Sequence, residues 1–205
     1  MFTAPRGRSS SAAICSKIFA FTSAVCGAAL TTAVQPAAIT GASERTSSVI
    51  GAFHGTMLRN EIFDFAQLGI YVERADNTAR ILDVKYYVLL PSISWVGSSL
   101  DNYQWESILR SVSAHRSYRW VYEADYKPRN IADFLILNRR MPRSLAYCYQ
   151  MIAESLKFLE EDYGERHPCH ATLDDIRSRL QPGTINAIFD GGLHEFLAHF
   201  IRCNN

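Results

Sequence analysis

The sequence predicts an all-α protein, a multi-helix bundle that follows a disordered or signal-like N-terminal leader. From Asn60 onwards, apolar residues recur at the spacing of helix turns, and no run alternates for long enough to indicate a strand. Prolines and capping residues separate these periodic segments, as they do between helices. At 205 residues the chain is long enough for a domain with a hydrophobic core.

The first 54 residues differ in composition from the rest and are assigned to the leader. They contain one acidic residue, Glu44, and an apolar run follows Lys17. A basic start, an apolar stretch and small residues at Thr31–Ala33 have the outline of a signal peptide. Ser, Thr and Gly dilute the run too much for a membrane span. We expect residues 55–205 to form a cytoplasmic helical domain, which is exported only if residues 1–33 act as a signal peptide.

Six helices are predicted in order along this domain. Pro91 ends the first, and the stretch Asn130–Asp133 resembles a capping box at the start of the third. Pro142 suits the first position of the fourth, and Gln181–Thr184 separates the last two. The predicted ranges are Asn60–Leu90, Tyr103–Tyr126, Asn130–Leu137, Pro142–Tyr163, Leu173–Leu180 and Ile185–Arg202.

Two of these helices have a clear apolar face that is expected to pack in the core. In the second helix this face is formed by Trp105, Ile108, Leu109 and Val112. In the fourth helix it is formed by Leu145, Cys148, Tyr149, Ile152, Leu156 and Leu159.

The first helix carries a charged stripe where core residues are expected. Its apolar face begins at Ile62 and continues into Glu73, Asp76, Asn77, Arg80 and Asp83, with apolar residues on both sides. The polar direction left for solvent contains Arg74, Thr78 and Lys85. The second helix places His115, Arg116 and Arg119 on its own core side.

Buried charges persist only when they are paired or hydrogen-bonded. We therefore predict a polar network between the two helices, in which Arg80→Ala would cost about 3–5 kcal/mol. Its members are Glu73, Arg74, Asp76, Asn77, Arg80, Asp83, His115, Arg116 and Arg119. The alternative is a solvated face with pairs four residues apart, such as Asp76–Arg80.

A second candidate site is the basic turn before the fourth helix, formed by Arg139, Arg140, Arg143 and Ser144. Guanidinium groups beside the free N–H groups of a helix start can bind an anion. The alternative is a solvated basic turn without a ligand.

Other chemistry is not indicated. His194 and His199 are five residues apart, not the four that a helical zinc motif needs, and His194 is expected to face solvent. The five cysteines are scattered without a CxxC pair, which suggests reduced thiols. A net charge of +1 gives no reason to expect a nucleic-acid partner. No metal, cofactor or catalytic residue is predicted.

Several stretches resemble the bacterial alpha-E domain family, which has a glutamate–arginine signature. They are "GIYVERADNTARILDVKYYVLLP", "NYQWES", "FLILNRRMPRSLAYC" and "GLHEFLAHFIR". The resemblance runs from about Gly55 to Arg202 and corresponds to the second of two related halves in that family. It implies an all-helical fold, with Glu73 and Arg74 as the signature pair, and assigns no reaction.

Family members are encoded beside ATP-grasp ligase-like and transglutaminase-like proteins, so the resemblance implies a non-catalytic accessory role in peptide modification. A protein partner of one of these classes is expected, and a homo-oligomer is possible. The alternative is a peptide- or small-molecule-handling enzyme that uses a buried network of acids and arginines.

Overall fold

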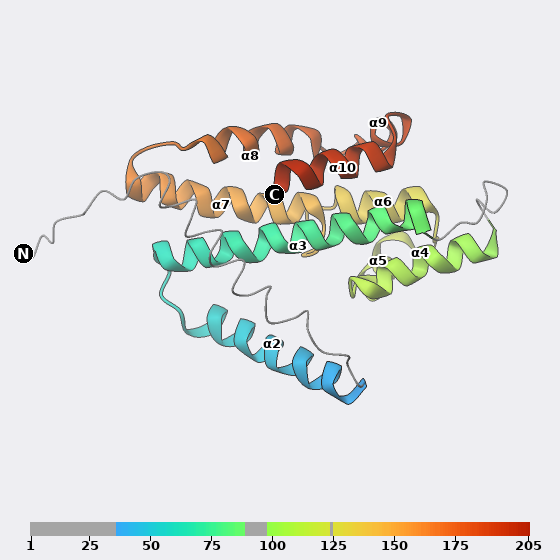
Figure 1. Cartoon of the computed structure of the whole chain (residues 1–205), viewed down its shortest axis with the longest axis horizontal. Coiled ribbons are helices and arrows are strands. Elements are labelled where there is room, and N and C mark those ends of the chain that lie inside the picture. Colours follow the sequence, from blue (N-terminus) through green and yellow to red (C-terminus); the bar gives the residue numbers. More distant parts are fainter. Residues whose placement is uncertain (1–35, 89–97, 124) are drawn as a thin grey trace, which may run out of the picture. The chain divides into compact units, whose positions relative to one another are not determined.

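The computed structural model describes residues 36–88, 98–123 and 125–205, which form helices and contain no strand (Figure 1). The predicted fold class is thus confirmed for the described residues. None of the helices in these ranges is long and apolar enough to cross a membrane. They are α2 (Pro36–Thr56), α3 (Glu61–Val88), α4 (Ser99–Ser111), α5 (His115–Tyr122), α6 (Pro128–Ile136), α7 (Leu145–Tyr163), α8 (Pro168–Arg179), α9 (Ile185–Asp190) and α10 (Leu193–Asn204).

The chain divides into two compact units, and the division at Gly69 falls within α3. In the first unit, the ring of Phe53 on α2 stacks on that of Phe63 at a centroid distance of 4.8 Å. The guanidinium of Arg59 lies 3.8 Å from the centre of the Phe63 ring. Residues 36–54 of the expected leader are therefore helical, and residues 1–33, with the signal-like pattern, lie outside the described residues.

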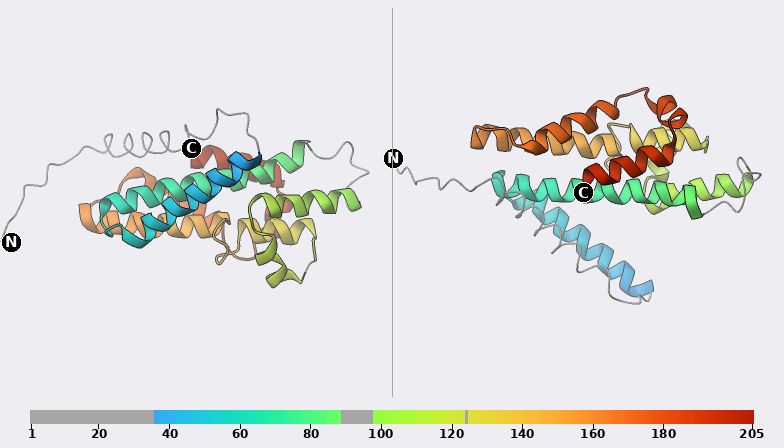
Figure 2. Two further views of the ribbon diagram at one scale, coloured as in Figure 1. Left: turned by 90° about the horizontal axis from the view of Figure 1, so that it is seen from below. Right: turned by 45° about the horizontal axis from the view of Figure 1, so that its top comes forward.

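In the second unit, α7 and α8 run side by side, and α10 packs beside α8 and α9 (Figure 2). The helix α6 contacts α4, α5, α7 and α9. Both predicted apolar faces are confirmed, because every residue assigned to them on α4 and α7 and at Val112 is buried.

Two predicted helices are each divided in the structure. The range Tyr103–Tyr126 separates into α4 and α5, because Ser113 adopts a positive φ of 55° and the N–H of Ala114 bonds to the carbonyl of Leu109. The range Ile185–Arg202 separates into α9 and α10 at Gly192, whose φ of 92° favours glycine. A single residue with positive φ ends a helix even where the apolar spacing continues.

Four predicted helix starts are also corrected, and the first is that of α4, which begins at Ser99 and not at Tyr103. The helix α7 begins after Ser144, whose Oγ accepts a hydrogen bond from the N–H of Tyr147, so Pro142 lies in the preceding turn. Pro128 and Pro168 stand in the first turns of α6 and α8, where the missing N–H costs nothing. The capping box expected at Asn130 is therefore inside α6.

An aromatic cluster occupies the core between α5 and α6. The rings of Tyr118 and Tyr122 stack at 4.9 Å, and Phe134 meets Tyr118 edge to face at 5.5 Å. The phenol of Tyr122 donates to Oδ2 of Asp133 at 2.6 Å, and that of Tyr118 donates to the carbonyl of Asp125. Burial raises the pKa of both phenols above the usual value.

We expect the free energy of unfolding to fall as pH rises above about 9. Burial raises the pKa of the Cys148 thiol from 9.0 to about 12, and burial also raises the pKa of Tyr118 and Tyr149. Below pH 9 both states keep these protons. Only the unfolded state releases the Cys148 proton above pH 9 and the tyrosine protons above pH 10, and each release costs about 1.4 kcal/mol per pH unit beyond that point.

Urea denaturation at pH 7, 9 and 10.5 measures this loss. Cys148→Val removes one of the titrating groups and should reduce the loss between pH 9 and 10.5. Stability that is constant or rising across this interval would contradict the expectation.

Candidate functional site

The helix α3 buries a different face from the one expected. Its buried residues after Gly69 include Tyr71, Ala75, Thr78, Ala79, Leu82 and Lys85. Glu73, Asp76 and Asp83 are half-buried, Asn77 is exposed, and the Arg80 side chain is 54% exposed. The stripe is therefore outside the core: Asn77 and Arg80 face solvent, and the three carboxylates lie at its half-buried border. Ala75 and Ala79, one turn apart, give the buried face of α3 two small side chains.

Thr78 and Lys85, which were expected at the solvent face of α3, are in fact buried and bonded, whereas Arg74 is half-buried. Thr78 Oγ1 donates to the carbonyl of Arg143 at 2.9 Å. Lys85 Nζ donates to Asp101 Oδ1 at 2.7 Å and to Gln104 Oε1 at 2.8 Å. The side chains of Lys85 and Asp101 are only 4% and 2% exposed, so this ion pair joins α3 to α4 inside the protein.

Asp76 and Asp83 of the charged stripe have partners on α3 itself and at the C-terminal end of the chain. Arg80 Nε donates to Asp76 Oδ2 at 2.6 Å, which is the helical pair of the alternative interpretation. Nδ1 of His194 donates to Asp83 Oδ1 at 2.6 Å, so His194 does not face solvent as expected. Nδ2 of Asn205 donates to the second oxygen of Asp76 at 3.4 Å.

The basic residues of the second predicted helix do not meet this stripe. His115 Nε2 lies 3.1 Å from Glu106 Oε1 and 2.9 Å from the hydroxyl of Tyr126. Arg116 and Arg119 are exposed on α5, and neither forms an ion pair within the described residues. The predicted network between the two helices is wrong, because the turn at Ser113 directs α5 away from the line of α4.

The basic turn before α7 has a defined backbone. Asn138 Oδ1 accepts hydrogen bonds from the N–H groups of Arg140 and Met141, at 2.8 and 3.1 Å. The Arg139 side chain turns to Gln181 Oε1 at 3.2 Å. Ser144 is fully buried as the N-cap of α7, and its hydroxyl donates to the carbonyl of Asn138. The four members of the predicted anion site therefore do not converge.

Arg143 instead lies near Arg74 of the signature pair. A guanidinium nitrogen of Arg74 donates to the carbonyl of Pro142 at 3.3 Å, and its guanidinium carbon lies 5.0 Å from the centre of the Tyr71 ring. Burial and the positive charge of Arg74 lower the pKa of Arg143. The rings of Tyr71 and Tyr147 are 6.1 Å apart. Helix periodicity could not predict the contact between Arg74 and Pro142, because 68 positions separate these residues in the sequence.

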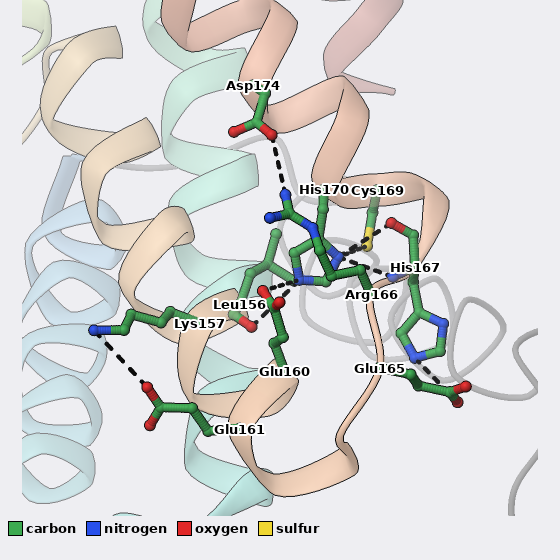
Figure 3. A network of polar contacts seen from close by, with 10 residues as sticks. All are labelled: Leu156, Lys157, Glu160, Glu161, Glu165, Arg166, His167, Cys169, His170 and Asp174. Carbon is green, nitrogen blue, oxygen red and sulfur yellow. Dashed lines mark hydrogen bonds and ion pairs between the residues drawn. The ribbon is translucent and has the colours of Figure 1, made fainter.

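A groove of about 550 Å³ lies between α7 and α8. His170, which is 4% exposed, lies in its lining, with Nε2 3.4 Å from the carbonyl of Leu156 and 3.7 Å from Glu160 (Figure 3). Arg166 donates to Asp174 at 3.0 Å across part of the lining. Four basic and three acidic side chains line the groove: Arg139, Lys157, Arg166, Arg177, Glu154, Glu160 and Asp174.

Within the described residues, no group of three or more His, Cys, Asp or Glu side chains could hold a metal ion.

The sequence matches the model of the Alpha-E family over residues 13–205, and that family is described as a predicted alpha-helical domain with a conserved ER motif. The match includes most of the segment assigned to the leader. No match was found among curated proteins or among solved structures.

Proposed function

Because this chain belongs to the Alpha-E family of helical domains, we propose that it is a non-catalytic accessory domain in peptide modification. It would dock onto an ATP-grasp ligase-like or transglutaminase-like enzyme. The observation that carries this proposal is the outer face of α5, which is defined here as Arg116, Arg119 and Trp120.

Trp120 is 90% exposed, although tryptophan is among the side chains that gain most from burial. Arg116 lies one helical turn before Trp120, and Arg119 directly precedes it. Tryptophan and arginine are enriched among the residues that dominate binding energy at protein interfaces. The outer face of α5 thus combines an apolar anchor with two cations.

The charge of this face favours an acidic partner segment. Within the described residues, Arg116 and Arg119 have no carboxylate partner, so both guanidinium groups are available for a partner's Asp or Glu side chains. Opposite charge speeds association and sets the orientation of the complex. The partner surface should offer a pocket for the indole, bordered by carboxylates.

Trp120→Ala is expected to weaken binding of the ligase-like or transglutaminase-like partner about thirtyfold, the effect of losing an interface anchor. Arg116→Glu/Arg119→Glu should prevent co-purification, because it reverses the charge of the face. The measurement is co-purification of the tagged chain with the proteins encoded beside it, followed by titration of the recovered complex.

Phe158→Ala is the matched control, since Phe158 is also an exposed aromatic residue, 56% accessible, on α7. It should leave co-purification unchanged. Equal binding by Trp120→Ala and the unsubstituted chain would reject docking through α5. Ligation assays with and without the chain test the other hypothesis: peptide ligation by this chain alone would favour the enzyme.

A further inference from the structure

Two bonds to α3 hold the end of the basic turn in a fixed position. A guanidinium nitrogen of Arg74 binds the carbonyl of Pro142, and Thr78 Oγ1 binds the carbonyl of Arg143. Arg74 and Thr78 are four residues apart and therefore lie on one side of the helix. These contacts place the Arg74 guanidinium at the residue before Arg143 and hold the backbone of Arg143 against α3, and neither of them uses the exposed Arg143 side chain.

The two guanidinium groups repel each other in the free protein. Within the described residues, neither Arg74 nor Arg143 forms an ion pair with a carboxylate. Glu73 is adjacent in sequence but lies about 100° away around the helix axis. The lowered pKa of Arg143, caused by burial and then by Arg74, reflects the same unfavourable environment. An anion between the two groups would convert this repulsion into attraction.

Aromatic rings form the adjacent wall. The Tyr71 ring lies beside the Arg74 guanidinium, in a cation–π contact that restrains the arginine. The Tyr147 ring is 6.1 Å from Tyr71 and comes from the first turn of α7. The Tyr71 ring limits the freedom of Arg74, so less side-chain entropy is lost when Arg74 binds a ligand.

We propose that Arg74 and Arg143 together bind one oxyanion, the carboxylate or phosphate group of a ligand. Guanidinium groups present paired N–H donors that match the oxygen spacing of both groups. This site is separate from the outer face of α5 and goes beyond the docking role. The proposed site keeps Arg143 from the anion site predicted at the basic turn. Arg74 of the signature pair takes the place of Arg139, Arg140 and Ser144.

The test is isothermal titration of the full chain at low ionic strength. The probes are inorganic phosphate, N-acetyl-alanyl-alanine with a free carboxylate, and the same dipeptide as its C-terminal amide. We expect binding of phosphate, of the free carboxylate, or of both, and none of the amide. The two anionic probes distinguish a phosphate ligand from a peptide carboxylate.

Arg143→Gln should weaken anion binding at least about tenfold, since it removes a charge-assisted contact. Arg74→Lys keeps the charge but loses the paired donors, so it should also weaken binding. Arg140→Gln is the control, because Arg140 is exposed in the same turn and only its backbone N–H is bonded there. It changes the net charge by the same amount as Arg143→Gln and should bind normally.

Thermal melts with and without phosphate give a second measurement. Phosphate should raise the Tm of the unsubstituted chain and of Arg140→Gln by the same amount, and should raise that of Arg143→Gln by less. Circular dichroism establishes that each variant is folded, as expected for Arg143→Gln because α3 holds the backbone of this residue. Failure of both anions to bind, or equal losses for Arg140→Gln and Arg143→Gln, would overturn the proposal.

Discussion

Lys85→Met is expected to lower the free energy of unfolding by about 3–5 kcal/mol. The substitution leaves the Asp101 carboxylate, which is 2% exposed, without its cation inside the protein. It also removes the hydrogen bond from Lys85 to Gln104 and the ammonium group 5.6 Å from the Trp105 ring. Urea denaturation at pH 7 measures the loss.

Two companion variants separate the cost of an isolated charge from the value of the ion pair. Lys85→Met/Asp101→Leu should recover most of the stability, because apolar residues can replace a buried pair with little loss. Arg80→Ala should cost no more than about 1 kcal/mol, since the Asp76–Arg80 pair is at the surface. The loss of unfolding free energy that the sequence predicts for Arg80→Ala is therefore expected for Lys85→Met instead. A double variant as unstable as Lys85→Met would show that packing, and not the stranded charge, sets the cost.

Phe134→Ala should also lower the free energy of unfolding by about 3–5 kcal/mol, through lost burial and the cavity left behind. Phe134 is 2% exposed and meets Tyr118 and Tyr122 edge to face. Calorimetric melts provide the measurement. Phe158→Ala removes the same atoms from an exposed position and should change stability by less than about 0.5 kcal/mol. Similar losses in the two variants would contradict a core role for the aromatic cluster.

Elements with a strong apolar stripe could be predicted from sequence. The faces of α4 and α7 combine large apolar residues at helical spacing, and burial of those side chains determines how a helix packs. Boundaries were less predictable, because local backbone bonding decides them. Ser144 ends the basic turn by capping α7, and Ser113 ends α4 through a conformation that serine seldom adopts.

The orientation of α3 could not be predicted because its polar residues are satisfied from distant parts of the chain. Thr78 and Lys85 are inside because Arg143 and Asp101 supply their partners. A polar residue with such a partner can be buried at little cost, whereas periodicity assigns it to solvent. Periodicity fails for the candidate anion site for the same reason. From the sequence, Arg74 was assigned to the charged stripe and Arg143 to the basic turn, and only the folded chain brings the two segments together.

The contacts of α3 with α10 determine when the helix can complete its packing during synthesis. The carbonyl of Val72 accepts a hydrogen bond from Asn204, which is 132 positions later in the chain. The carboxylate of Asp83 likewise binds His194, which is 111 positions later. At about 5–20 residues per second, translation of the intervening chain takes roughly 7–26 s. During that interval, the last partners of the signature helix are still being made. Asp76 and Asp83 place negative charge on the side of α3 that later contacts His194 and Asn205. Because charged residues oppose aggregation, this side of α3 resists association with other chains until those contacts form.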